Sequence, residues 1–233
     1  MSEIPPMDTP PPSTAPAAGL PWEEPDAGLS SIFPTVTQFV VSPLRSFEKV
    51  SLTTDLVRPL AYFVLFVLLG ALVGQLWRYV FWTPENSGIN LIPKGVLAAA
   101  PWFKVLLGRP TALIVLGIMI VAPLLNLITL FLWSGVVHLV LTMVAGAQGG
   151  FGATLRVVCY SQTACIALIV PFAGGIVQIL WSLVLQIIGL SQVHRAASWK
   201  ASVAVLAPLV FCCGCLVGLV LISGLAAGGL LNR

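Results

Sequence analysis

The sequence predicts an all-α integral membrane protein: a bundle of five transmembrane helices, preceded by a disordered N-terminal tail and an interfacial amphipathic helix. Composition gives the first indication, since 58% of the 233 residues are hydrophobic and only 8% are charged. The second is that no aspartate or glutamate occurs from Asn86 to Arg233, where long runs of Leu, Val, Ile, Ala and Gly dominate. A soluble domain carries charges of both signs on its surface, so such a stretch is stable only where the solvent is hydrocarbon.

Two segments precede the membrane domain, which we place at residues 59–233. Residues 1–28 are rich in Pro, Ala and acidic residues and bury too little apolar area to offset the entropy of ordering, so we predict a disordered tail. Residues 29–58 carry an apolar stripe at helical spacing, and Ser42-Pro43 is typical of a helix start, which indicates two short helices lying on the membrane surface. The stripe is Ile32, Val36, Val40, Leu44, Phe47 and Val50, with Arg45, Lys49 and Arg58 available to lipid phosphates.

Five apolar runs in the membrane domain are long enough to span a bilayer. The first extends from about Pro59 to Trp82, with aromatic residues at its far end as in an interfacial belt. The second, residues 112–145, would rise about 50 Å as one helix, so Pro123 predicts a break and a main span over residues 123–145. The other spans are expected at residues 154–170, 173–190 and 203–230.

An odd number of spans places the two termini on opposite sides of the membrane. With the N-terminus inside, the inner segments hold six basic residues (Arg45, Lys49, Arg58, Arg156, Arg195 and Lys200). The outer segments then hold four or five (Lys94, Lys104, Arg109 and Arg233, with Arg78 near the end of its span). The positive-inside rule therefore favours a cytoplasmic N-terminus.

Residue types that carry catalytic or metal-binding chemistry form only weak patterns. Cys212 and Cys215 make a CxxC, but no histidine or second pair stands near it in sequence to complete a zinc site, so we interpret both as packing residues. Ser134 and His138 share a helix face without a nucleophile elbow or an orienting acid. We predict no catalytic residue, metal or cofactor, and the scattered basic residues argue against a nucleic-acid partner.

Polar side chains recur at helical spacing inside two of the predicted spans. The second span carries Asn126, Ser134, His138 and Thr142, and the fourth carries Gln178, Ser182 and Gln186. Such groups should face the interior of the bundle, either as a substrate path with a pH-sensing His138 or as interhelical hydrogen bonds worth about 0.6 kcal/mol each. We favour packing, because an ion path normally also carries an ionisable carboxylate. Gly70-x-x-x-Gly74 and Gly214-x-x-x-Gly218 permit close helix contacts, within the bundle or between two copies.

Several short motifs occur in a characteristic order along residues 22–205. They are Pro21–Glu23, Thr35, Pro43 and Phe47; Asp55-Leu56-Val57-Arg58-Pro59-Leu60; Gly149-Gly150-Phe151; Thr154-Leu155-Arg156-Val157; Tyr160-Ser161; and Pro171, Gly175, Trp181, Gly189-Leu190, His194 and Lys200-Ala201. This order resembles the Yip1 domain family of five-span membrane proteins. The second motif resembles the family's DLxGP element, with Arg58 where Gly is usual, and Cys159 stands where the tyrosine-serine motif often has Gly.

The resemblance implies a membrane protein without a settled chemistry. Eukaryotic members associate with prenylated Rab-type GTPases and with each other. The lead-in and the Ala, Gly and Pro richness of this chain resemble bacterial members instead, so we expect a bacterial inner membrane and do not carry over a Rab partner.

Together these observations predict a non-enzymatic membrane organiser or adaptor. Its cytoplasmic N-terminus, residues 1–58, would recruit proteins, and membrane lipids and further copies of the chain are expected partners. The alternative is a small transporter or channel subunit that uses the polar stripes. The candidate functional residues are Asp55, Leu56, Pro59, His138, Tyr160, Ser161, Gln178 and Gln186.

Overall fold

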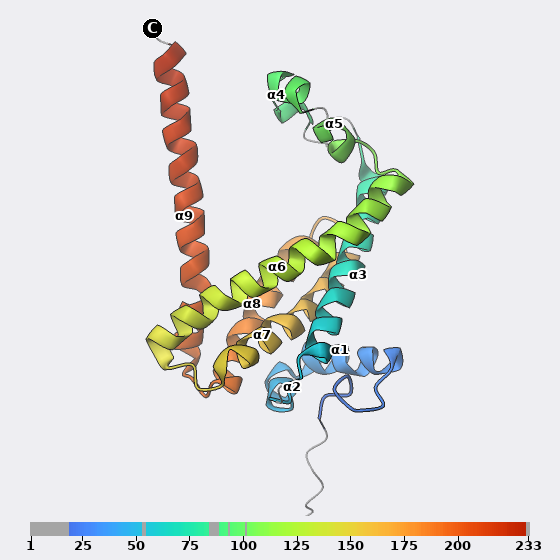
Figure 1. Ribbon diagram of the computed structural model, residues 1–233, viewed down its shortest axis with the longest axis vertical. Helices are drawn as coiled ribbons and strands as arrows, with labels where there is room; N and C mark the ends of the chain where they lie inside the picture. Colours follow the sequence, from blue (N-terminus) through green and yellow to red (C-terminus); the bar gives the residue numbers. More distant parts are fainter. Residues whose placement is uncertain (1–18, 53–54, 84–88, 93, 101, 232–233) are drawn as a thin grey trace, which may run out of the picture.

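The computed structural model describes residues 19–52, 55–83, 89–92, 94–100 and 102–231, and within these ranges every regular element is helical (Figure 1). Within the described ranges, five helical segments are long and apolar enough to cross a membrane, which confirms the prediction. They are α3 (Val57–Phe81), α6 (Ala112–Ala145), α7 (Gly150–Ser161) continued by the 3₁₀ helix η3 (Gln162–Ile169), α8 (Gly174–Val193) and α9 (Ser198–Leu231). Shorter helices η2 (Ile89–Leu91), α4 (Lys94–Ala99) and α5 (Trp102–Leu107) connect α3 to α6.

The third span is the centre of the bundle. Each residue from Ala153 to Ser161 is buried, and α7 packs against α3, α6 and α8. By contrast, α6 exposes most of its apolar side chains, as expected for a helix that faces lipid. Gly70 of α3 lies close to this span: a Cβ on it would stand 3.3 Å from Leu168 Cδ1. Gly74, Gly214 and Gly218 have open space around them, so association of two copies through these positions stays a prediction.

The predicted break at Pro123 is wrong, because α6 continues through it from Ala112 to Ala145. A proline inside a helix removes one backbone N–H and leaves one carbonyl without its usual partner. Membrane helices tolerate this loss, since local adjustments satisfy the freed group. The third span, expected at residues 154–170, is α-helical only in its first half, and its second half is the 3₁₀ helix η3.

Two short helices do form in the N-terminal segment, on either side of Ser42 as predicted: α1 (Ile32–Val41) and α2 (Pro43–Glu48), preceded by the 3₁₀ turn η1 (Leu29–Ser31). They lie across one end of the bundle (Figure 1). The predicted stripe is divided between two faces. Val36, Phe47 and Val50 are buried in the core, whereas Val40 and Leu44 are exposed.

The Phe47 ring is buried because Gly189 leaves room for it on α8. A Cβ on Gly189 would stand 2.8 Å from Phe47 Cε1 and 2.6 Å from Val157 Cγ1, closer than carbon atoms pack. Phe39 of α1 then stacks on Tyr160, with ring centroids 5.3 Å apart, and meets Phe47 edge-on at 5.0 Å. The segment is therefore joined to α7 and α8 by aromatic packing.

Predicted disorder in the tail is wrong for residues 19–28, which the structure describes. Leu20 is fully buried and Trp22 is 7% exposed, both within the main hydrophobic core. The average composition of the tail did not reveal this, because burial of only two large apolar side chains is enough to attach a short segment to a preformed surface. Residues 1–18, the remainder of the predicted tail, lie outside the described residues.

Candidate functional site

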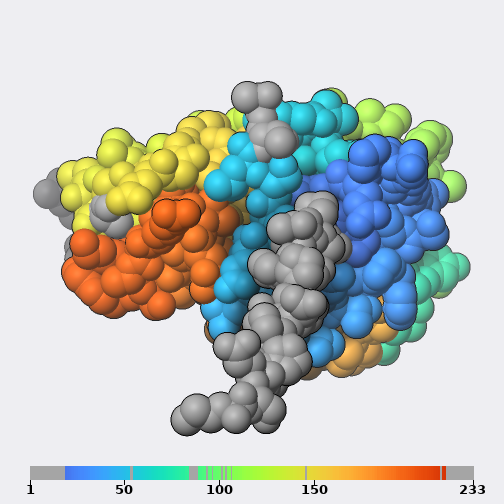
Figure 2. All heavy atoms as spheres, turned by 90° about the horizontal axis from the view of Figure 1, so that it is seen from below, coloured from blue at the N-terminus to red at the C-terminus, as the bar shows by residue number. Residues whose placement is uncertain are grey.

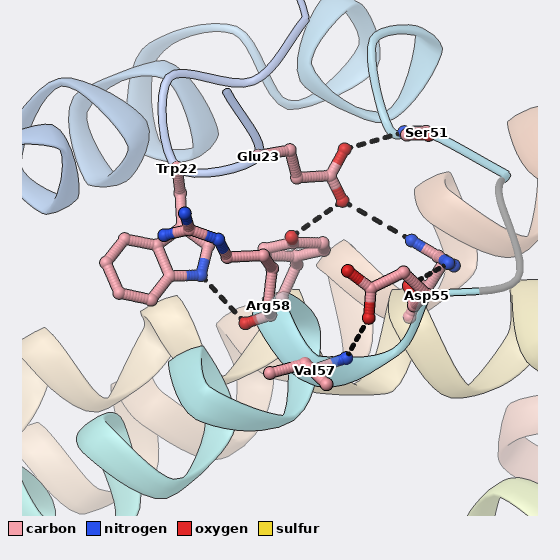
Figure 3. Close-up of polar contacts among 8 residues, drawn as sticks. Trp22, Glu23, Ser51, Asp55, Val57 and Arg58 are labelled. Atoms are coloured by element: carbon pink, nitrogen blue, oxygen red, sulfur yellow. Dashed lines mark hydrogen bonds and ion pairs between the residues drawn. The ribbon is translucent and has the colours of Figure 1, made fainter. Parts of the chain in front are cut away.

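Side chains from the N-terminal segment and from α7 meet in a buried polar cluster (Figure 3). At its centre is the carboxylate of Glu23. Its Oε1 accepts a 2.7 Å hydrogen bond from the Tyr160 hydroxyl and lies 3.6 Å from Nη1 of Arg156. Its Oε2 accepts a 2.7 Å hydrogen bond from the backbone N–H of Ser51. Both charged side chains are almost fully enclosed, with 8% of Glu23 and 2% of Arg156 exposed.

Arg156 also ties this cluster to the start of α3. Its Nη2 donates a hydrogen bond to the backbone carbonyl of Asp55. The Asp55 carboxylate accepts a 2.8 Å hydrogen bond from the backbone N–H of Val57, the first residue of α3. Asp55 therefore satisfies an unpaired donor at the helix start while its main chain holds the arginine. We call Trp22, Glu23, Asp55, Arg156 and Tyr160 the N-terminal clamp.

Trp22 forms the outer part of the clamp. Its backbone N–H donates to Oγ1 of Thr35 at 3.1 Å, and its indole N–H donates to the carbonyl of Arg58 at 2.8 Å. The Arg58 guanidinium lies 5.7 Å from the indole centroid and donates to the carbonyls of Ala27 and Pro25. Arg58 was expected to face lipid phosphates, but these donors bind the backbone of the N-terminal segment instead.

Charge burial makes the clamp sensitive to the loss of either ionic partner. Breaking a buried ion pair typically destabilises a protein by about 3–5 kcal/mol, because the remaining charge stays buried without compensation. The Glu23 carboxylate has donors from Tyr160, Ser51 and Arg156 around it. The arrangement therefore positions the chain, and it resembles a structural ion pair more than a base awaiting a substrate proton.

A second polar chain links the ends of α6, α7 and α8. Nδ1 of His138 and Oγ1 of Thr154 are 2.9 Å apart, and Thr154 Oγ1 lies 2.9 Å from Nε2 of His194. Nδ1 of His194 accepts the backbone N–H of Gly149 at 3.0 Å. For neutral rings this fixes the direction of the chain: His194 donates to Thr154, which donates to His138.

Burial, together with the neighbouring His138, lowers the pKa of His194 from 6.5 to about 4. His194 follows the last residue of α8 and is 2% exposed. The ring is therefore neutral in the folded protein at physiological pH, in agreement with the hydrogen bond that its Nδ1 accepts from the backbone N–H of Gly149. Near neutral pH, His194 therefore acts as a fixed hydrogen-bond donor to Thr154.

The structure separates the remaining candidates. Asp55 and Tyr160 belong to the clamp, and the buried Pro59 lies in the first turn of α3. Leu56 packs at the edge of a smaller apolar cluster, and the Ser161 hydroxyl donates to the Val157 carbonyl of its own helix. Farther from the clamp, Gln186 accepts the Trp133 indole N–H at 2.8 Å, while Gln178 donates to the Cys165 sulfur at 3.1 Å.

The Yip1 domain matches residues 37–222, which is most of the chain. The chain belongs to the Yip1 family. No curated protein and no solved structure matches it. The matched range contains Asp55, Arg156 and Tyr160 of the clamp, whereas Trp22 and Glu23 precede it.

Sequence reasoning did not include Trp22, Glu23 or Arg156 of the clamp among the candidate functional residues, and it assigned Trp22 and Glu23 to a disordered tail. Of these three residues, Glu23 is the centre of the clamp. A signal for it was present in this Yip1 sequence. Arg156 stands alone as a charge within an apolar span, and a charged residue at such a position normally has a partner. Since all acids lie at or before Glu85, the partner had to come from the N-terminal part of the chain.

Proposed function

We propose that this Yip1 protein is a non-enzymatic membrane organiser or adaptor of the bacterial inner membrane, which recruits partners through a cytoplasmic N-terminal region. One observation carries the proposal: the clamp attaches the N-terminal segment to the bundle through buried contacts while α1 and α2 present an exposed apolar and basic face. We call this the recruitment face, and it consists of Phe33, Val40, Val41, Leu44, Arg45 and Lys49.

The recruitment face combines two kinds of interaction. Phe33 and Val41 are 79% and 73% exposed, so their burial against a partner or a lipid surface would be favourable in free energy. Arg45 and Lys49 add attraction to anionic lipid at about 1 kcal/mol each near the membrane. Figure 2 views this end of the molecule, where the blue N-terminal segment lies beside the cyan start of α3. An exposed surface that combines apolar and basic residues, on a segment attached to the bundle, suits the docking of a partner.

The polar stripes give less support to a transporter. His138 and Gln186 bond to Thr154 and to Trp133 of neighbouring helices. Thr142 bonds to the carbonyl of His138 in its own helix. These bonds use the polar groups for packing, which leaves the adaptor as the function that we favour.

If the N-terminal region recruits partner proteins, changes in it that leave the bundle folded should release those proteins. Deletion of residues 1–18 leaves the clamp intact, whereas deletion of residues 1–28 would remove Glu23 and destabilise the fold. We expect that the shorter deletion and Val41→Asp each strip proteins from the crosslinked complex in native membranes. The matched control is Leu91→Asp, because Leu91 is 88% exposed in η2, far from the recruitment face. A partner list that stays the same in both altered proteins would remove the basis for an adaptor.

A further inference from the structure

A hollow of about 210 Å³ lies within the membrane-spanning part of the molecule, between α3, α6, η3 and α8. Its polar lining consists of three primary amides, Asn126, Gln162 and Gln178, and the thiol of Cys165. Its apolar wall includes Gly70 of α3. Gly70 stands about 20 Å along the helix axis from Val57, so the hollow is near the middle of the span.

The amides in this hollow have weak partners. Gln178 donates to the Cys165 sulfur at 3.1 Å, and that thiol donates to Oε1 of Gln162 at 3.2 Å. Asn126 donates to the Ala122 carbonyl of its own helix. A primary amide offers two donors and a carbonyl oxygen that accepts two bonds, and thiols are weak donors and acceptors. Most of the hydrogen-bonding capacity of these three side chains is therefore available to a ligand.

The backbone that lines the hollow differs from that of the neighbouring helices. The third span changes from α-helix to 3₁₀ helix at Gln162 and keeps that form to Ile169. Runs of 3₁₀ helix longer than three or four residues are uncommon, and within a helix they often mark a functional hinge or a sequence under strain. Irregular backbone at membrane depth is tolerated where it lines a cavity. Gln162 and Cys165, on η3, line this one.

The lining also selects the chemistry of an occupant. Among the described residues, none that lines the hollow is charged, so an ionic head group would lose its hydration without compensation. Asn126 is exposed on α6, where Leu124 and Leu125 beside it are 59% and 57% exposed toward the hydrocarbon. The hollow therefore opens toward acyl chains and offers hydrogen bonds to an uncharged head.

We propose that this hollow binds the uncharged, hydroxyl-bearing head of a membrane lipid of the diacylglycerol class. The hydroxyl and ester groups meet the amides of Gln162 and Gln178, and the acyl chains lie along the exposed face of α6. An uncharged lipid can reach this depth, whereas the head of a phospholipid is held at the interface by its charge. The site is separate from the clamp and from the recruitment face, so its test does not depend on the adaptor role.

Photocrosslinking of the full chain in vesicles tests the site. The probe is a diacylglycerol with a photoreactive group next to its glycerol, in phosphatidylcholine vesicles to which competing lipids are added. We expect labelling on peptides that contain Asn126, Gln162 or Gln178, with competition by unlabelled diacylglycerol. The double variant Gln162→Leu/Gln178→Leu should reduce labelling at least tenfold. Ala71→Leu, which fills the hollow and keeps the amides, should reduce it as well.

Ser182→Ala is the matched control, because Ser182 lies one turn beyond Gln178 on α8 and its hydroxyl donates to the Ile179 carbonyl of its own helix. It should label like the unaltered protein. Equal labelling of the control and of the Ala71→Leu variant would overturn the proposal. Competition by phosphatidylglycerol alone, or a hollow occupied by ordered water in lipid containing diacylglycerol, would overturn it too.

Discussion

Replacement of Arg156 by methionine is expected to lower the free energy of unfolding by about 3–5 kcal/mol. Methionine keeps most of the apolar stem but leaves the Glu23 carboxylate buried, with its ionic partner gone. The loss should appear as a shift in a denaturant titration in mixed micelles. Arg45→Met is the matched control, because Arg45 is exposed on α2; it should change stability by less than about 0.5 kcal/mol.

A second substitution separates the clamp from a general loss of packing. In the double variant Glu23→Gln/Arg156→Met no buried charge is left without a partner, and the amide introduced in place of the carboxylate can still meet Tyr160 and Ser51. We expect it to be more stable than Arg156→Met alone, since residues in one network are not additive. A double variant that is as unstable as the sum of both single variants would contradict an ionic role.

Phe47→Asp is expected to be the most damaging single change in the N-terminal segment. It removes a ring that is 2% exposed, and the loss of such a ring typically lowers the free energy of unfolding by about 3–5 kcal/mol. It also places a carboxylate between α2 and α8. The segment should leave the bundle, which protease digestion would reveal as new cleavage sites between residues 30 and 52. Leu44→Asp, at a position that is 52% exposed on the same helix, is the control.

The control distinguishes two explanations of the apolar stripe. If Phe47 acted through membrane attachment, as the stripe alone suggested, Leu44→Asp and Phe47→Asp would behave alike. The structure predicts that Leu44→Asp weakens binding at the recruitment face while the segment stays resistant to protease. Equal cleavage of both variants would show that the buried position of Phe47 is not decisive.

Sequence patterns predicted the spans well because hydrophobicity is a local property. The run from Pro59 to Trp82 became α3 (Val57–Phe81) almost without change. Local patterns were less informative about helix continuity, since nothing in the sequence says whether neighbouring groups can accommodate Pro123. They were also silent on the 3₁₀ form of η3, which packs against α3 and α8.

The clamp could be predicted only in part for a related reason. Tyr160 and Asp55 were found through the resemblance, which records motifs but does not pair them. The bond between Tyr160 and Glu23 joins residues 137 positions apart, and no periodicity connects them. The counting argument that links the charge of Arg156 to acids of the N-terminal part is physical, and it would have identified Glu23 as one of eight possible partners.

Hydrogen exchange tests the central claim, that residues 20–51 are a fixed part of the membrane bundle. The measurement follows the peptide covering residues 20–31 in the full chain embedded in lipid nanodiscs. We expect the backbone N–H of Trp22, which is bonded to Thr35, to exchange far more slowly than in an unstructured peptide. In the Arg156→Met variant this protection should be lost while α8 stays protected. Exchange of residues 20–31 at the unstructured rate in the unaltered protein would contradict the clamp.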